Sequence, residues 1–121
     1  MKKVLLIDDS LTFRNAIKKI LESIDPKIKV YEAENGKDGF HMLTEQSFDR
    51  IFTDLEMEGS DGRAFLEKIM GNKILSKKNI TILSSDISSD LKQRFKDNKN
   101  ITFINKATLA IMSTKIAELF K

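Results

Sequence analysis

Five short apolar runs alternate along this chain with longer segments whose apolar residues recur at helical spacing. The runs lie at about 3–8, 28–33, 49–54, 79–84 and 101–105, and a helix is predicted after each one. Alternation of this kind is typical of βα units, which build one parallel sheet with helices on both faces. The chain is therefore predicted to adopt an α/β fold, a doubly wound five-stranded parallel sheet with five helices.

The composition of each run predicts its place in the sheet. The first, third and fourth runs are almost continuously apolar, as expected of central strands that are buried on both faces. The second run, Ile28-Lys29-Val30-Tyr31-Glu32-Ala33, alternates with period two and suits an edge. These features predict the strand order 2-1-3-4-5, the flavodoxin-like arrangement, in which ligands bind beside the carboxyl ends of strands one and three.

Local signals place the helix ends and the loops. Ser10 is a predicted N-cap for a helix whose apolar residues include Leu11, and Pro26 follows its end. The polar stretch from Glu56 to Asp61 is predicted to be a loop. The 121 residues favour a single domain, 1–121, with one core.

Three acidic residues lie where predicted strands end. Asp8 and Asp9 close the first run, and Asp54 closes the third. The carboxyl ends of neighbouring parallel strands meet at one rim, where like charges repel unless a cation or a proton offsets them. Mg2+ prefers oxygen ligands of this kind and keeps waters that a phosphoryl group can replace. Read singly, Asp8 and Asp9 are also good first-turn acids of a helix, and Asp54 is an ordinary turn acid.

Two further polar residues follow later strands and are predicted to reach the same rim. Ser84 closes the fourth run, and Lys106 follows the fifth. Alone, each is an ordinary strand-end hydroxyl or a solvated lysine. Together with three carboxylates and a divalent cation, a hydroxyl and an ammonium indicate phosphoryl chemistry.

Composition excludes several other classes of site. The chain has no Cys and one His, His41, so disulfides, thiolate metal sites and histidine clusters are excluded. No apolar run approaches the ~20 residues of a membrane span, and a cytoplasmic protein is expected. Residues 1–60 carry a net charge of −3 and residues 61–121 one of +6. The basic half is interpreted as a solvated surface, with docking of an acidic partner as the alternative.

The chain resembles the response-regulator receiver domains of bacterial two-component signalling, most of all the stand-alone chemotaxis type. The resemblance covers the whole chain and depends on an ordered set of residues, each at the matching strand end. They are Asp8-Asp9, Asp54, Gly62, Ser84, Phe103 and Lys106.

The resemblance implies a role for each residue of the site. Asp54 would take a phosphoryl group from a phosphohistidine. Asp9, Asp54 and the backbone carbonyl of Glu56 would bind Mg2+, with Asp8 acting through a metal-bound water. Lys106 and Ser84 would contact the phosphoryl oxygens, and Phe103 would then turn inward as a switch.

The resemblance also implies partners. A sensor histidine kinase or a phosphotransfer protein would donate the phosphoryl group, and a downstream protein would bind the face of the fourth helix, fifth strand and fifth helix. The chain would be a signalling phosphoacceptor, in a chemotaxis-like system or a phosphorelay, rather than an enzyme. No membrane is expected, and nucleic acid only if an output domain lies outside this chain. If the chain is complete, its output is protein binding.

Four residues depart from the family pattern. Glu58 and Ala107 stand where Pro is usual and Ser85 where Ala is usual, and Glu56 adds a carboxylate beside the site. Without Pro, the peptide after Lys106 loses the usual support for a cis bond, so the direction of Lys106 is left open. These departures motivate the alternative of a phosphorylation-independent interaction module.

Two other classes are disfavoured. A phosphatase of the haloacid-dehalogenase type would carry Asp-x-Asp after the first strand, whereas Asp8 and Asp9 are adjacent. A flavin carrier would need a hydroxyl-rich phosphate loop at the same place.

Overall fold

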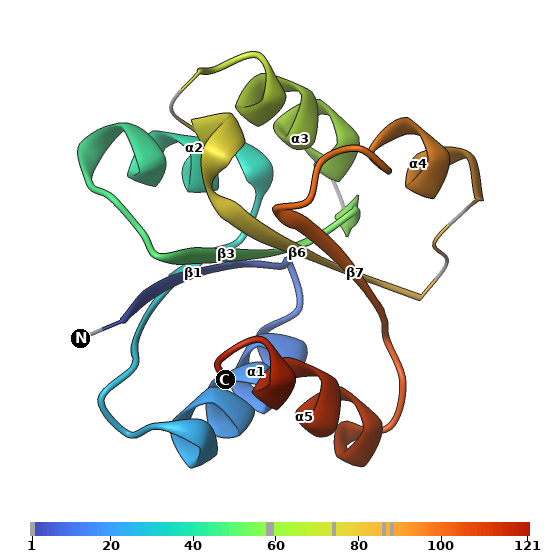
Figure 1. Cartoon of the computed structure of the whole chain (residues 1–121). Helices are drawn as coiled ribbons and strands as arrows, with labels where there is room; N and C mark the ends of the chain where they lie inside the picture. The colour runs from blue at the N-terminus through green and yellow to red at the C-terminus, as the bar shows by residue number, and fades with distance from the viewer. Residues whose placement is uncertain (1, 58–59, 74, 86, 88) are drawn as a thin grey trace.

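The computed structural model describes residues 2–57, 60–73, 75–85, 87 and 89–121. Its main sheet has five parallel strands in the order β2-β1-β3-β6-β7 (Figure 1). Because β6 and β7 are the fourth and fifth strands of this sheet along the chain, the predicted order 2-1-3-4-5 is confirmed. The strands are β1 (Lys3–Ile7), β2 (Lys29–Ala33), β3 (Arg50–Asp54), β6 (Asn79–Ser84) and β7 (Ile101–Asn105).

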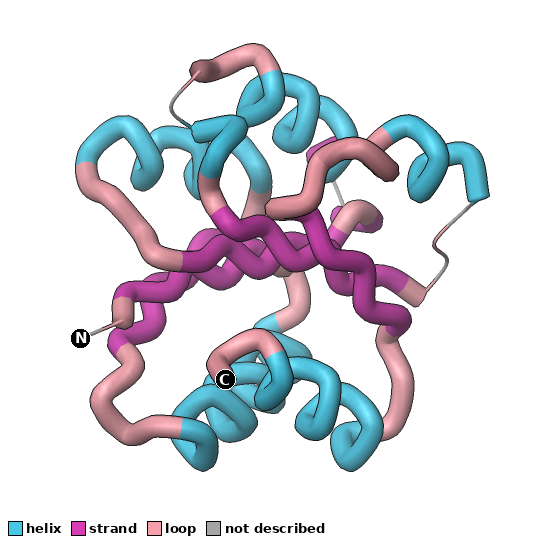
Figure 2. The backbone as a smooth tube through the Cα atoms, in the orientation of Figure 1, coloured by secondary structure: helices cyan, strands magenta, loops and turns pink. Residues whose placement is uncertain are grey.

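Helices cover both faces of the sheet, as the alternation of elements predicts (Figure 2). On one face, α1 (Leu11–Ile24) and α5 (Leu109–Glu118) lie side by side. The other face carries α2 (Gly36–Glu45), α3 (Gly62–Met70) and α4 (Ser89–Arg94), with a short 3-10 helix, η1 (Leu75–Lys77), before β6.

The two faces of the sheet have separate apolar cores. In β1, Leu5 and Ile7 pack toward the α2–α3 face, while Val4 and Leu6 pack toward the α1–α5 face. All four are at most 1% exposed, so this strand is central, as its continuous apolar sequence predicts. A strand held on both faces gives the residue that follows it, Asp8, a fixed position.

Two details of the sequence-based prediction are wrong. The segment predicted as a loop contains a small antiparallel ribbon, β4 (Glu56–Met57) paired with β5 (Ser60–Asp61). Strands of two residues are too short to show a period-two pattern. In addition, Leu11 does not belong to the buried face of α1, because it is 58% exposed at the first position of the helix.

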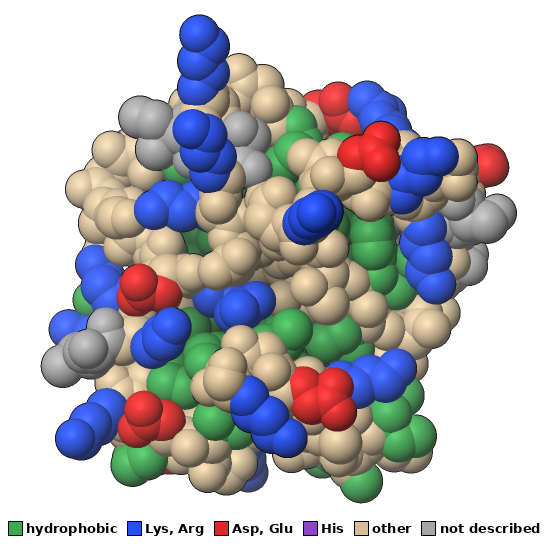
Figure 3. Space-filling view, in the orientation of Figure 1, with side chains coloured by type: hydrophobic (Ala, Val, Ile, Leu, Met, Phe, Trp, Pro, Cys, Tyr) green, Lys and Arg blue, Asp and Glu red, His purple; other side chains and the backbone are tan. Residues whose placement is uncertain are grey.

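Surface features agree with a mixed charge distribution. On the face shown in Figure 3, basic side chains are scattered among acidic and apolar ones and form no continuous stripe. Among the described residues, none of the helices combines the length and the apolar character that a membrane span requires.

Candidate functional site

Three carboxylates meet at the carboxyl ends of β1 and β3. Ile7 pairs with Thr53 in the sheet, so Asp8 and Asp54, the next residues, emerge side by side. One carboxylate oxygen from each of Asp8, Asp9 and Asp54 lies within 4.8 Å of the others. Asp8 and Asp54 are 1% and 4% exposed, whereas Asp9 is exposed. The sheet therefore brings together the three acids that were predicted to share one rim.

Lys106 reaches this cluster from the end of β7. Its backbone nitrogen donates to the carbonyl oxygen of Ser84 at 2.8 Å, which extends the β6–β7 pairing by one residue. Its ammonium donates to Oδ2 of Asp54 at 3.0 Å and to Oδ2 of Asp8 at 3.2 Å. With Ala107 in place of the usual Pro, the lysine is still directed at the acids.

Burial and ion pairing shift the pKa values of Asp8 and Lys106 in opposite directions. Burial raises the pKa of the Asp8 carboxyl, and the nearby Asp54 adds to that effect; a hydrogen bond from Ser10 and the charge of Lys106 offset only part of it. Burial alone would lower the pKa of Lys106, but the hydrogen bond to Asp54 and the attraction of both acids outweigh burial and raise it. The lysine is therefore charged at neutral pH, while ionised Asp8 is held at a cost.

A partly buried ion network that the sequence analysis missed contacts the backbone of Asp8. Arg14, which is 7% exposed in α1, donates from Nη1 to the carbonyl oxygen of Asp8 at 2.5 Å. Its Nε pairs with Oε1 of Glu32 at 2.9 Å, and Lys18 pairs with Oε2 of the same carboxylate at 3.0 Å. The sequence does contain a signal for this network. Arg14 and Lys18 are four residues apart, so they share one face of a helix, and the edge strand that follows contains an acid, Glu32.

The aromatic ring of Phe13 is the second neighbour that sequence reasoning missed. The ammonium of Lys106 lies 4.1 Å from the centroid of this ring, within the range of a cation–π interaction. An apolar residue in a helix gives no signal of this kind, because packing is its usual role.

The structure describes some of the remaining predicted residues and not others. Ser84 is fully buried at the end of β6. Phe103 is partly buried in β7 and packs against the core on the α2–α3 face. The side chain of Glu56 and the whole of Glu58 fall outside the described residues, and Gly62 begins α3. The roles given to these residues stay predictions.

The carboxylate cluster has the chemistry that a hard divalent cation requires. Asp8, Asp9 and Asp54 offer oxygen ligands close enough to share one ion. Lys106 pairs with two of the three, Asp8 and Asp54. A magnesium site at this rim fits the residues that are present.

Comparison with known protein families agrees with this geometry. A family model described as the response regulator receiver domain matches residues 4–115. This chain belongs to the response regulator receiver family. Receiver domains are phosphoacceptor signalling domains of two-component systems, and their family binds Mg2+ at an acidic cluster.

Curated relatives of this receiver are longer proteins. A protein-glutamate methylesterase/protein-glutamine glutaminase of Pseudoalteromonas atlantica is 40% identical over 72 residues, which is 59% of this chain and 19% of the relative. The transcriptional regulatory protein LiaR of Bacillus subtilis is 40% identical over 91 residues, which is 74% of this chain and 42% of LiaR. The chain thus spans less than half of either relative.

Solved receiver structures share the fold of this chain at low sequence identity. The chemotaxis response regulator CheY4 of Vibrio cholerae is 24% identical, with a TM-score of 0.80 over 100% of this chain and 99% of CheY4. The phosphorylated cyanobacterial phytochrome response regulator RcpA is 21% identical, with a TM-score of 0.83 over 98% of this chain and 90% of RcpA. The Mn2+-bound response regulator Rcp1 is 19% identical, with a TM-score of 0.83 over 98% of this chain and 91% of Rcp1.

Proposed function

We propose that residues 1–121 form one cytoplasmic receiver domain that takes a phosphoryl group on Asp54 from a histidine kinase or a phosphotransfer protein. One observation carries the proposal: Lys106 bridges the buried carboxylates of Asp8 and Asp54, and the exposed carboxylate of Asp9 lies beside them. A carboxylate nucleophile, further oxygen ligands and an ammonium are the groups that phosphoryl transfer to an aspartate needs.

Each residue of the site has a separate task in this proposal. An oxygen of the Asp54 carboxylate attacks the phosphorus of a phosphohistidine, the new P–O bond forms as the P–N bond breaks, and the histidine nitrogen keeps the electron pair. Asp8, Asp9 and Asp54 would hold the metal, together with the backbone carbonyl of Glu56. Bound Mg2+ would offset negative charge on the phosphoryl oxygens.

The chain's own cation completes this charge balance. Lys106, which pairs with the Asp54 carboxylate before transfer, would pair with a phosphoryl oxygen afterwards. Ser84 would donate its hydroxyl to another phosphoryl oxygen, and Phe103 would move inward in response. These steps stabilise charge and position the reacting atoms, which is most of what phosphoryl transfer asks of a protein.

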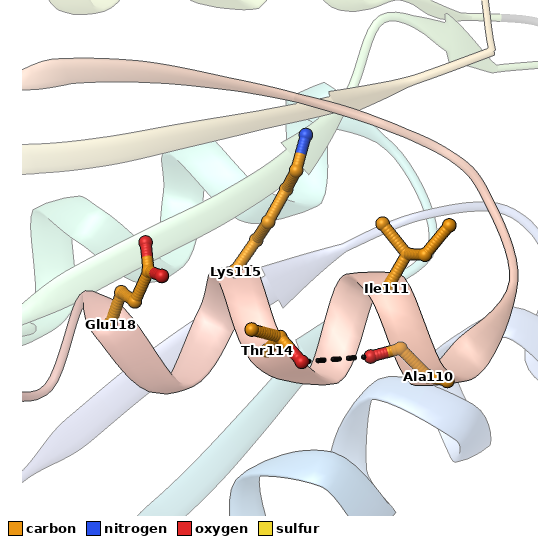
Figure 4. Close-up of a pocket in the computed structure, with 5 residues that line it drawn as sticks. All are labelled: Ala110, Ile111, Thr114, Lys115 and Glu118. Carbon is orange, nitrogen blue, oxygen red and sulfur yellow. Dashed lines mark hydrogen bonds between the residues drawn. The ribbon is translucent and has the colours of Figure 1, made fainter.

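The output of this proposal is protein binding at the face formed by α4, β7 and α5. Ala110, Ile111, Thr114, Lys115 and Glu118 line an open hollow of about 460 Å³ on α5 (Figure 4). Ile111 is 49% exposed there, and Leu109 on the same helix is 56% exposed, so α5 offers apolar surface that a partner could bury. A downstream protein that buries this isoleucine would bind differently once Phe103 in β7 has moved.

A mass measurement tests the proposal. After incubation with acetyl phosphate and Mg2+, the protein should gain the mass of one phosphoryl group, and it should gain none when the metal is chelated. Asp54→Asn should abolish the gain. Asp49→Asn, at the opposite end of β3, is the matched control and should leave the gain unchanged.

The alternative, a phosphorylation-independent interaction module, predicts the opposite result. Neither acetyl phosphate nor a beryllofluoride mimic would then change the mass or the amide spectrum around residues 54, 84 and 103. An unchanged mass and an unchanged amide spectrum in a folded protein would reject the phosphoacceptor proposal and favour the interaction module.

A further inference from the structure

Lys106 and three residues around it form a closed circuit of contacts. Oδ1 of Asp8 accepts from the backbone nitrogen of Ser10 at 2.9 Å, and Oγ of Ser10 accepts from the backbone nitrogen of Phe13 at 3.2 Å. The Lys106 ammonium lies 4.1 Å from the centroid of the Phe13 ring. The same ammonium donates to Oδ2 of Asp8 at 3.2 Å, which closes the circuit. The N-cap of α1 therefore places an aromatic ring on the ammonium of the site.

The backbone of Lys106 is fixed, but its side chain needs a further constraint. Its nitrogen is tied to Ser84, and α5 begins only at Leu109, after the N-cap Thr108. Between them, Ala107 imposes no fixed backbone angle of the kind that proline would. The lysine side chain has four rotatable bonds and is 24% exposed, so solvent is an open alternative for its ammonium.

The ring of Phe13 is well held for this purpose. It is partly buried and packs against the core cluster on the α1–α5 face. The next residue, Arg14, is buried and hydrogen-bonded to the carbonyl oxygen of Asp8. A ring packed against the core presents a fixed surface, and an ammonium is attracted to an aromatic face most strongly where water is partly excluded.

We propose that Phe13 is a positioning residue for Lys106, holding the ammonium over the acids and against solvent. The inference rests on the proposed function, since its effect on rate requires that Lys106 contact the transferring phosphoryl group. When the phosphoryl group is on Asp54, the ring limits the ammonium to a short movement from the carboxylate to a phosphoryl oxygen. Phe13 thus supplies the restraint that Ala107 does not.

The test compares Phe13→Leu, which removes the ring and keeps an apolar side chain, with Phe13→Trp, which keeps an aromatic face. Phe40→Leu is the matched control, because Lys68 lies 5.6 Å from the Phe40 ring, outside the site. The first readout is the proton shift of the Lys106 Cε methylene in isotope-labelled lysine, assigned by the signal that disappears in Lys106→Arg. The second is the rate of phosphorylation by acetyl phosphate at saturating Mg2+.

The proposal predicts an upfield ring-current shift of the Lys106 methylene that is lost in Phe13→Leu and kept in Phe13→Trp and Phe40→Leu. It also predicts a phosphorylation rate about threefold to tenfold lower in Phe13→Leu, from the usual strength of such contacts, with near-normal rates in the other two variants. Thermal unfolding of all variants identifies any general loss of fold.

Three outcomes would overturn the role of Phe13. The first is a lysine methylene with no upfield shift in the unaltered protein, and the second is an unchanged rate in Phe13→Leu despite loss of the shift. The third is an equal loss of rate in Phe13→Trp, which would mean that only the packing of phenylalanine matters. Failure of the unaltered protein to take up a phosphoryl group is a different result, which removes the proposed function and this role together.

Discussion

Nζ of Lys106 lies 3.0 Å from Oδ2 of Asp54, which joins the residue after the last strand of the sheet to the end of its middle strand. The two residues are 52 positions apart in sequence. This ammonium offsets negative charge on a carboxylate that lies close to those of Asp8 and Asp9. Replacing that pairing by a metal and a phosphoryl group is the chemical event that the proposed function requires.

The ionised form of Asp8 is expected to lower the stability of the metal-free protein. Because burial raises the pKa of Asp8 above 3.8, its charged form costs free energy in the folded state. We expect Asp8→Asn to raise the free energy of unfolding at pH 7 without divalent cations, by on the order of 1 kcal/mol. Denaturant titrations across pH 4 to about 8 measure the difference.

The sign of the pH dependence follows from linkage. Because the pKa of Asp8 is higher in the folded than in the unfolded state, its contribution to folding stability is most favourable below the unfolded-state pKa, near 3.8. That contribution is lost as the pH rises through the folded-state pKa. The advantage of Asn over Asp should therefore shrink as the pH falls. An advantage that grew toward low pH, or a less stable Asn variant at pH 7, would contradict the balance described for Asp8.

Glu32 is expected to behave in the opposite way. Burial alone would raise its pKa, but hydrogen bonds from Lys18 and Arg14 and their charges lower it below 4.5. The stabilisation is present above that value and is lost as the pH falls through the folded pKa. Glu32→Gln should therefore lower the free energy of unfolding by about 0.5–1 kcal/mol at pH 7 and by almost nothing at low pH. The value is small because the Glu32 side chain is 30% exposed.

The matched control is Glu22→Gln, an exposed acid on the same helix as Arg14. Its unfolding free energy at pH 7 should stay near that of the unaltered protein. A loss at Glu32 that is constant with pH would show that packing, not the ion network behind Asp8, accounts for the effect.

Gly39 lets α2 pack closely on Ile7, the residue before Asp8. A Cβ at this position would lie 2.5 Å from Cδ1 and 2.9 Å from Cγ1 of Ile7. Overpacking of this kind outweighs the gain in helix propensity, so Gly39→Ala should lose about 1–2 kcal/mol of unfolding free energy. Thermal or denaturant unfolding measures it.

Ile7→Val removes Cδ1 and supplies a rescue. The double variant should recover part of the loss of Gly39→Ala, so the two changes should be non-additive. Gly71→Ala is the control, since a Cβ there would meet its nearest atom, the carbonyl oxygen of Glu67, at an ordinary 3.5 Å. Strict additivity at Gly39 and Ile7 would contradict the close contact.

Thr81, in the buried interior of β6, is expected to tolerate loss of its hydroxyl. Within the described part of the chain, its Oγ1 is buried without a hydrogen-bond partner. Thr81→Val keeps the shape and removes the unsatisfied atom, which should stabilise the protein by about 1 kcal/mol. Destabilisation by Thr81→Val in urea would indicate that a bound water satisfies the hydroxyl.

The sheet and its acidic rim could be predicted because each depends on a local pattern. Asp8 and Asp54 end apolar runs, and any parallel sheet brings neighbouring strand ends together. Ser10 was identifiable as an N-cap because its residue type precedes a helical pattern. These signals require no knowledge of which helix packs on which face.

Residues whose role depends on tertiary contacts could not be predicted in the same way. Phe13 and Arg14 have ordinary helix positions, and only the packing of α1 on the sheet beside α5 brings them to Lys106 and Asp8. The period-two pattern of the edge strand predicts that Glu32 points toward solvent. It gives no sign that Arg14 and Lys18 pair with this carboxylate. The ribbon at Glu56–Met57 is too short for any periodic signal.

The most direct test of the central claim is chemical trapping of the acyl phosphate. After incubation with acetyl phosphate and Mg2+, reduction with borohydride converts a phosphorylated aspartate into homoserine, which peptide sequencing by mass spectrometry locates. The account predicts homoserine at position 54 and aspartate at positions 8 and 9. Homoserine at another position, or none in a protein that remains folded and binds Mg2+, would contradict it.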